Sequence, residues 1–285
     1  MSQLQPGSIP QLTIEAPQEL ATARARLASF DTARLRGVME LVGLNEAGNP
    51  IRVALLPESY PMSQRTPPPT AGYALPDEGL IVLFPARSPR YPHDTLEDVL
   101  HHEVAHVLMA RAAGGGELPL WFHEGMAVLA ERRWGLEDQA RLMRELFLVS
   151  RTPLDAIDAM FASDEGSKAR AYTLASAFVR DLIARHGSDA PAGILRRVRD
   201  GETFERAFAI TTGESVAQAE NVFWRRHRFW TSILSFLTTS TALWMIVTVI
   251  ALVAIIRRRQ QRAARRKRWE EEEAEESSES RESEE

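Results

Sequence analysis

The pentapeptide His102-Glu-Val-Ala-His106 contains the side chains with the clearest chemistry in this sequence. On a helix, residues four apart lie one turn along the axis and about 40° around it, so both imidazoles can reach one ion. Glu103 does not share the direction of His102, but it can accept a proton from a water at the open position of that ion. The spacing predicts a bound metal ion with a general base beside it.

A third ligand is available in the segment Trp121-Phe-His-Glu-Gly-Met-Ala127, which is expected to open a second helix after a short glycine and proline turn. Seventeen residues separate His106 from Glu124, enough for the chain to reverse and return to the ion. The chain has no cysteine, which excludes thiolate ligands, disulfides and thiol nucleophiles. Two imidazoles and one carboxylate leave a position for water, so we predict a catalytic metal site with three protein ligands.

Three neighbouring side chains could compete for the same ion. His101 and His123 adjoin predicted ligands but point elsewhere on their helices, so supporting or surface roles are expected for them. Glu131 is seven residues beyond Glu124 and therefore on the same helix face. It is the alternative ligand, or a hydrogen-bond partner for a ligand histidine.

The helix that carries the pentapeptide has recognisable ends. Asp94 or Thr95 can cap its start, with Glu97 or Asp98 three residues later completing a capping box. The glycines at 114–116 are expected to end it, which implies about five turns. This helix and the one after it must position the predicted site.

The remaining sequence predicts strands before residue 95 and mainly helices after it. A helical pattern covers 18–44, and a proline-rich loop covers 57–70. Strands are expected at 11–15, 51–56, 72–75 and 80–84, the last two forming a hairpin that turns at 76–79. We therefore expect an α+β fold with a small mixed sheet and a helical second half.

Three motifs, HHEVAHVL, LPLWFHEGMA and AYTLASAFVRDLIARHG, resemble those of the gluzincin metallopeptidases, specifically the bacterial peptidase MA-like families. The resemblance covers roughly residues 51–230. It implies a zincin-like domain with a mixed sheet over the active-site helix, a zinc cofactor and hydrolysis of peptide bonds. By motif match, His102, His106 and Glu124 are the metal ligands and Glu103 is the general base.

The same resemblance suggests a group that stabilises the oxyanion of amide hydrolysis. In related gluzincins the third motif can present a tyrosine hydroxyl to the site, which makes Tyr172 the catalytic candidate; the alternative is a tyrosine that packs a helix start. Arg170 and His186 are weaker candidates. Thermolysin-like enzymes place an aspartate four residues past the ligand glutamate, and this chain has Val128 there. The spacing between His106 and Glu124 is also slightly shorter than in the better-known branches.

The C-terminal part predicts a membrane anchor. Residues 233–256 contain no charge and as a helix extend about 36 Å, enough to span a bilayer. Eight basic residues follow at 257–268, a bias that favours a cytoplasmic tail and an extracytoplasmic domain. The N-terminus has no apolar signal stretch, so a cytoplasmic domain is the alternative. The expected division is a peptidase domain at 1–231, a transmembrane helix at 232–257 and a charged, disordered tail at 258–285.

These features predict a single-pass membrane protein that hydrolyses peptide bonds with a metal-activated water. Its partners are a peptide or protein substrate and, through the anchor, membrane lipid, with no nucleic acid. The hairpin between Tyr73 and Phe84 is expected to offer an edge strand to an extended peptide. The alternatives are an inactive zinc-binding membrane scaffold and a zinc hydrolase of a non-peptide bond.

Overall fold

The structure is a computed structural model that describes residues 9–68, 70–88, 92–131, 135–148 and 151–237, with single helical positions between 244 and 258. The chain separates into two compact units, residues 1–227 and 228–285. The elements are β1 (Leu12–Glu15), α1 (Ala21–Ala28), α2 (Leu35–Val42), β2 (Ile51–Leu55), α3 (Pro61–Arg65), β3 (Gly72–Leu75), β4 (Leu80–Leu83), α4 (Leu96–Ala113), α5 (Leu120–Glu131), α6 (Leu136–Leu148), α7 (Leu154–Met160), α8 (Glu165–His186), α9 (Ala190–Arg199), α10 (Phe204–Thr212) and α11 (Val216–Leu237). Short 3-10 turns lie at Gln18–Leu20, Thr32–Arg34, Pro76–Glu78 and Pro85–Arg87.

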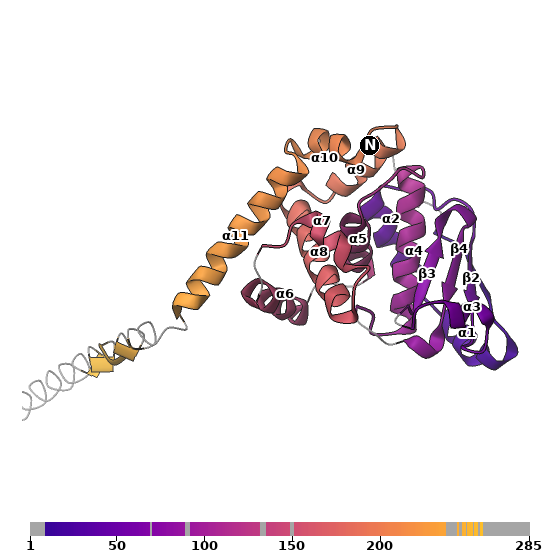
Figure 1. Ribbon diagram of the computed structural model, residues 1–285, viewed down its shortest axis with the longest axis horizontal. Helices are drawn as coiled ribbons and strands as arrows, with labels where there is room; N and C mark the ends of the chain where they lie inside the picture. Colours follow the sequence, from indigo (N-terminus) through magenta and orange to yellow (C-terminus); the bar gives the residue numbers. More distant parts are fainter. Residues whose placement is uncertain are drawn as a thin grey trace, which may run out of the picture. The chain divides into compact units, whose positions relative to one another are not determined.

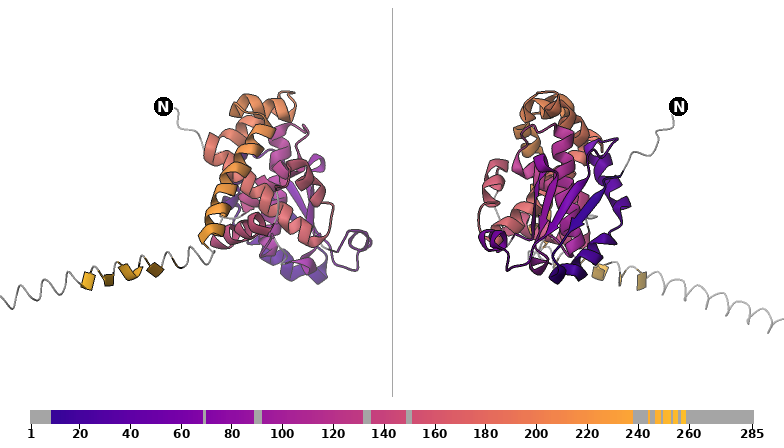
Figure 2. Two further views of the ribbon diagram at one scale, coloured as in Figure 1. Left: turned by 60° about the vertical axis from the view of Figure 1, so that its left-hand side comes forward. Right: turned by 90° about the vertical axis from the view of Figure 1, so that its right-hand side faces the viewer.

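The sheet has four strands in the order β1-β2-β4-β3, and the right-hand view of Figure 2 shows it at the front. β1, β2 and β4 are parallel, whereas β3 runs antiparallel to β4 as the second arm of a hairpin. Ile51, Val53 and Leu55 are buried, and the residues between them are more exposed, because successive strand residues point to opposite faces. The predicted strands, the hairpin and the mixed sheet of an α+β fold are confirmed.

Two local predictions before residue 95 were wrong. The expected helix over 18–44 is interrupted after Ala28, and the carboxylate of Asp31 accepts the N–H of Ala33 to start a new turn. The break lets α1 bury Leu27 and α2 bury Leu35 in the same core. The proline-rich loop over 57–70 contains the short helix α3, which starts at a proline, a residue suited to the first helical position.

α4 lies beside the sheet and contacts β3 (Figure 1). It begins as predicted, because the Thr95 hydroxyl accepts the backbone N–H of Asp98 at 3.1 Å. It ends at Gly114, whose φ of 62° places it in the left-handed region that glycine adopts without steric cost. The absence of a side chain at Gly72 allows β3 to approach, since a Cβ there would lie 3.0 Å from Val99 Cγ1. The predicted five-turn helix is therefore held close to the strand at the end of the sheet.

The helical half packs around α5 and α8, which make close contact with each other, and α5 also contacts α4. Aromatic rings fill the space between these helices and α10, with ring centroids 4.9–5.7 Å apart for the neighbours of Trp121. The buried rings of this cluster are Trp121, Phe122, Phe178, Phe204, Phe208 and Phe223. The core therefore continues from the sheet through α4 into the second half.

Arg87 holds the segment between β2 and β3 in place. Its guanidinium forms two bonds to the carboxylate of Glu58, at 2.7 and 3.0 Å. It also donates to backbone carbonyls of Ser63, Pro67 and Thr70 at 2.6–3.1 Å. A planar guanidinium has five N–H groups in fixed directions, so one side chain can satisfy several carbonyls that no helix or sheet would bond.

The predicted membrane span falls largely outside the described residues, as does almost all of the charged tail. Within the part of the chain that the structure describes, no helix has both the length and the apolar character needed to cross a membrane. The anchor therefore stays a prediction from the sequence.

Candidate metal centre

α4 places His102, Glu103 and His106 inside the protein. Their exposed fractions are 2%, 6% and 7%, although all three are polar. Buried polar groups on a helix require partners, and these come from α5 and from β3. The pentapeptide therefore faces an enclosed site.

Glu124 is supplied by α5, whose first turn is capped by a distant residue. The backbone N–H groups of Leu120 and Trp121 donate to the carboxylate of Asp158 on α7, at 3.3 and 2.5 Å. A carboxylate at a helix start satisfies N–H groups that have no partner within the helix. The cap fixes the beginning of α5 one turn before Glu124.

Gly125 determines how closely α5 approaches α8. A Cβ at this position would lie 2.6 Å from the carbonyl oxygen of Ala175 and 2.8 Å from Val179 Cγ2. Only glycine fits where two helix backbones come this close. The residue after Glu124 is therefore held against α8, and this contact sets the position of the carboxylate.

The three predicted ligands converge. His102 Nε2 lies 3.3 Å and His106 Nε2 lies 3.7 Å from the same oxygen, Oε2 of Glu124. All three atoms lie within 4.8 Å of one another. Two ligands of a tetrahedral zinc ion, each about 2.0–2.1 Å from it, are roughly 3.3 Å apart. His102, His106 and Glu124, which we call the metal group, therefore have the chemistry and the spacing to hold a divalent cation.

The metal group has strong internal electrostatics. Burial alone would raise the pKa of Glu124, but the imidazoles of His106 and His102 outweigh it and lower that pKa. Burial likewise opposes a charge on His102, yet Glu124 and Glu131 raise its pKa well above the ordinary value. For His106 burial dominates, and its pKa is lowered. These shifts favour an anionic Glu124 that faces a single protonated imidazole, that of His102.

Glu103 lies outside the metal group and contacts β3. Burial raises the pKa of Glu103 to about 7, and the charge of Glu124 adds to the rise, whereas His102 and a hydrogen bond from the Ala74 backbone N–H oppose it. A carboxylate with a pKa near neutrality can both accept and release a proton at physiological pH. These are the properties of the predicted general base.

The two adjoining histidines have different surroundings. His123 stacks on His106, with ring centroids 4.3 Å apart and an interplanar angle of 22°. His101 is buried, and its Nδ1 lies 3.1 Å from the backbone carbonyl of Glu131. A surface position for His101 is therefore excluded, because its ring lies in the core near Phe30. Neither histidine belongs to the metal group.

A second cluster of possible ligands lies on the other side of His102. His93 Nδ1 is 2.9 Å and His102 Nδ1 is 3.3 Å from Oε2 of Glu131. We call His93, His102 and Glu131 the supporting group. Glu131 thus lies beside the predicted ligand His102, one of the two positions that its helical spacing suggested. His93 was missed, since it lies before α4 in a loop without any periodic pattern.

The three candidates for stabilising the oxyanion differ in whether they lie near the metal group. The ring of Tyr172, on α8, packs edge-on against His102 with centroids 6.2 Å apart. Arg170 instead donates to the Thr152 hydroxyl at 2.9 Å. His186 lies 14 residues beyond Tyr172 on the same helix, about 21 Å along its axis, and bonds to Glu214. Of the three, Tyr172 is the one whose ring contacts the metal group.

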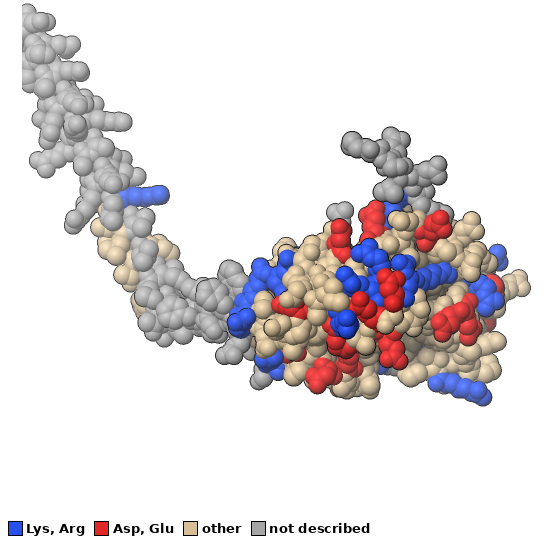
Figure 3. All heavy atoms as spheres, turned by 90° about the horizontal axis from the view of Figure 1, so that it is seen from above, with Lys and Arg blue, Asp and Glu red and all other residues tan. Residues whose placement is uncertain are grey.

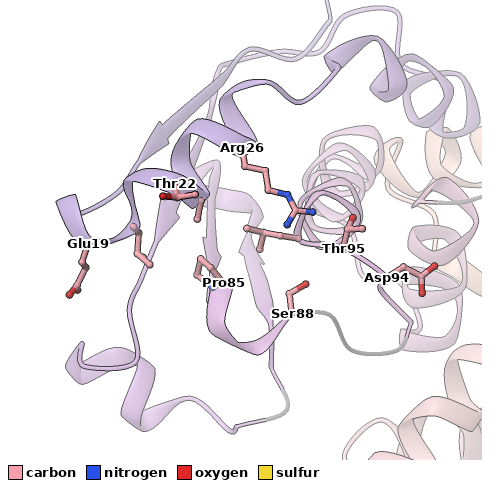
Figure 4. Close-up of a pocket in the computed structure, with 10 residues that line it drawn as sticks. Glu19, Thr22, Arg26, Pro85, Ser88, Asp94 and Thr95 are labelled. Carbon is pink, nitrogen blue, oxygen red and sulfur yellow. The ribbon is translucent and has the colours of Figure 1, made fainter.

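A different cavity, of about 520 Å³, opens at the N-terminal end of α4 (Figure 4). Two of its polar side chains are already engaged: Arg26 bonds to Glu97 at 2.5 Å, and Thr95 bonds to Asp98 at 2.6 Å. No residue of the metal group lines it. The cavity is therefore separate from the candidate centre.

The sequence was compared with models of protein families and with curated proteins, and neither comparison gave a match.

Proposed function

We propose that this chain is a zinc-dependent metallopeptidase of the gluzincin type, built on a zincin-like domain. The observation that carries the proposal is the convergence of the metal group within 4.8 Å while Glu103 stays outside it. A structural zinc site uses four protein ligands and needs no base. Three ligands beside a free carboxylate support a catalytic site instead.

Each residue has a defined task in the proposed reaction. His102, His106 and Glu124 hold the ion. A bound zinc ion would polarise the substrate carbonyl and lower the pKa of a water. Glu103 accepts the proton of the attacking water on its carboxylate and returns it to the nitrogen of the leaving amine. The Tyr172 hydroxyl donates a hydrogen bond to the substrate carbonyl oxygen, which becomes negatively charged in the transition state.

The backbone of β3 supports an extended peptide as the substrate. Phe84 donates its N–H to the carbonyl of Ala71, and antiparallel pairing alternates, so the backbone groups of Gly72 and Ala74 point away from β4. The Ala74 N–H meets Glu103. A peptide that adds to this end of the sheet would therefore lie beside the general base.

The substitution Glu103→Gln tests the proposal. We expect the purified variant to retain one zinc per chain by elemental analysis and to lose at least about 100-fold in kcat on a peptide library, because proton transfer by a positioned base contributes at least that much. Glu117→Gln is the matched control, since Glu117 is exposed in the loop between α4 and α5.

The outcomes separate the alternatives. Retained zinc without hydrolysis by the wild type would indicate an inactive zinc-binding scaffold. Hydrolysis that depends on Glu103 but is faster on compact esters or amides than on extended peptides would indicate a hydrolase that acts on a non-peptide bond. A wild-type chain without bound metal contradicts both the enzyme and the scaffold.

We also propose that residues 233–256 anchor the enzyme in a membrane with the tail of residues 258–285 in the cytoplasm. The support is the uncharged stretch and the basic residues that follow it. The chain has no cysteine, so single-cysteine variants can be labelled without background. We expect an impermeant thiol reagent to label a cysteine in the peptidase domain of intact cells and to label one in the tail only after permeabilisation. The reverse pattern would place the domain in the cytoplasm.

A further inference from the structure

The two ring nitrogens of His102 face two different carboxylates. Nε2 lies 3.3 Å from Glu124 in the metal group, and Nδ1 lies 3.3 Å from Glu131 in the supporting group. A neutral imidazole has one N–H and one lone pair. His102 can therefore bind an ion through Nε2 only if its proton is on Nδ1, the nitrogen that faces Glu131.

Glu131 receives two imidazoles on one oxygen. His93 Nδ1 and His102 Nδ1 both approach Oε2, at 2.9 and 3.3 Å, and the Glu131 side chain has no exposed surface. The contact to His93 is a hydrogen bond, whereas His102 Nδ1 is close to the same oxygen without the geometry of a hydrogen bond. A buried carboxylate requires hydrogen-bond donors. His93 supplies one to the same Glu131 oxygen that faces His102.

The end of α5 is held by the same residue. The backbone carbonyl of Glu131 accepts from His101, while its carboxylate meets His93 and His102. Three histidines from α4 and the loop before it thus converge on the last residue of the helix that carries Glu124. The position of Glu131 is therefore defined from both its backbone and its side chain.

We propose that His93 and Glu131 are positioning residues for the metal centre. Glu131 holds the proton of His102 on Nδ1, and His93 holds Glu131 in place as an acceptor. This inference rests on the proposed metal site, but not on peptide hydrolysis. The supporting group could bind a second ion only if His102 lost both ring protons, and the 2.9 Å separation of His93 and Glu131 is that of a hydrogen bond.

Zinc affinity of the full chain, measured by competition with a chelator, tests the proposal. Glu131→Gln is expected to weaken zinc binding by about 10- to 100-fold, the usual effect of removing a partner of a ligand histidine. His93→Phe should weaken it by about 10-fold. The double variant should match Glu131→Gln alone, because His93 acts only through Glu131.

Two controls make the result specific. His93→Asn retains a side-chain N–H donor and is expected to restore most of the affinity. His186→Phe removes the histidine of a remote His–Glu pair, whose atoms are 3.0 Å apart, and should leave zinc affinity unchanged. A His186 variant that weakens binding equally would indicate a general loss of stability and overturn the proposal.

A second measurement needs no variant. In the zinc-loaded wild type, 15N NMR should find the His102 proton on Nδ1, and elemental analysis should find one zinc per chain. Losses that add in the double variant, a proton on Nε2 of His102, or a second bound ion would each overturn the proposal. A chain that binds zinc in the expected pattern but hydrolyses no peptide would refute the peptidase and leave this inference standing.

Discussion

The position of Tyr172 is compatible with two roles, stabilisation of the oxyanion and packing of its ring. Its ring packs edge-on against His102 and against Phe161, with centroids 6.2 and 5.1 Å apart. A hydroxyl that donates to the oxyanion acts in the transition state and not in substrate binding. We predict that Tyr172→Phe lowers kcat by about 100-fold, with KM and zinc content nearly unchanged.

Steady-state kinetics with extended peptides check this prediction, and Tyr60→Phe serves as the control because Tyr60 is exposed. A normal kcat with a lower Tm would assign Tyr172 to packing alone.

At the residue scale, the spacing predicted the metal group because its two histidines lie one turn apart on one helix and a single chain reversal returns Glu124 to them. Glu131 was left between two roles, since spacing gives the face of a helix but not what the face meets. His93 could not be predicted, because the loop before α4 carries no pattern and only the fold places it 2.9 Å from Glu131. The burial of His101 likewise depends on Phe30, a residue far away in sequence.

At the element scale, Gly125 links the position of Glu124 to the packing of α5 on α8. We predict that Gly125→Ala destabilises the protein by about 2 kcal/mol, because the added methyl would meet the backbone of Ala175 and the helices must separate. Zinc affinity should fall as well, since the separation moves Glu124. Denaturant unfolding and chelator competition measure the two effects.

Gly37→Ala is the matched control for Gly125→Ala. Gly37 is an exposed glycine within α2, and an added Cβ there would meet no atom within 4 Å. This substitution is expected to stabilise the protein by about 0.5–1 kcal/mol, because alanine restricts the unfolded chain and favours the helix. Equal destabilisation by both substitutions would show that the contact with α8 is not the cause.

The ends of α4 were predictable because they depend on local groups, the Thr95 hydroxyl and Gly114. The interruption between α1 and α2 was not, because it serves a distant requirement. A continuous helix over 18–44 would preserve its apolar spacing, but the turn after Ala28 lets Leu27 and Leu35 enter one core. Local signals thus predict where an element ends only when no tertiary contact competes with them.

At the scale of the whole molecule, the described domain carries basic and acidic side chains close to one another on its surface. Figure 3 shows basic and acidic side chains side by side over one face of the domain. One partly buried cluster joins α8 to the segment before α11, where Arg185 and His186 both bond to Glu214. Arg185 also bonds to Asp181 at 2.8 Å, and Arg226 approaches the same carboxylate. The cluster connects helices that are distant in sequence.

This cluster predicts a pH-dependent contribution to stability. Burial opposes the charge on Glu214, but Arg185 and His186 outweigh it, so its pKa is lowered from 4.5. A depressed carboxyl pKa stabilises the fold above the unfolded-state pKa, and this stabilisation is lost as pH falls through the folded-state value. Glu214→Gln should therefore cost about 1 kcal/mol at pH 7, and the difference from wild type should shrink below about pH 4.5.

Thermal unfolding between pH 3 and pH 7 measures this difference, with the exposed Glu205→Gln as the control. A gap that stays constant down to pH 3 would show that Glu214 does not contribute through its charge.

The Asp158 cap has a consequence for synthesis on the ribosome. All three residues of the metal group have been translated by the end of α5, but the carboxylate that caps this helix and the α8 backbone against which Gly125 rests come later. An emerging chain therefore contains all three residues of the metal group before the contacts that position them can form. We therefore expect ion capture at the proposed site to wait until the following helices have left the ribosomal tunnel and docked.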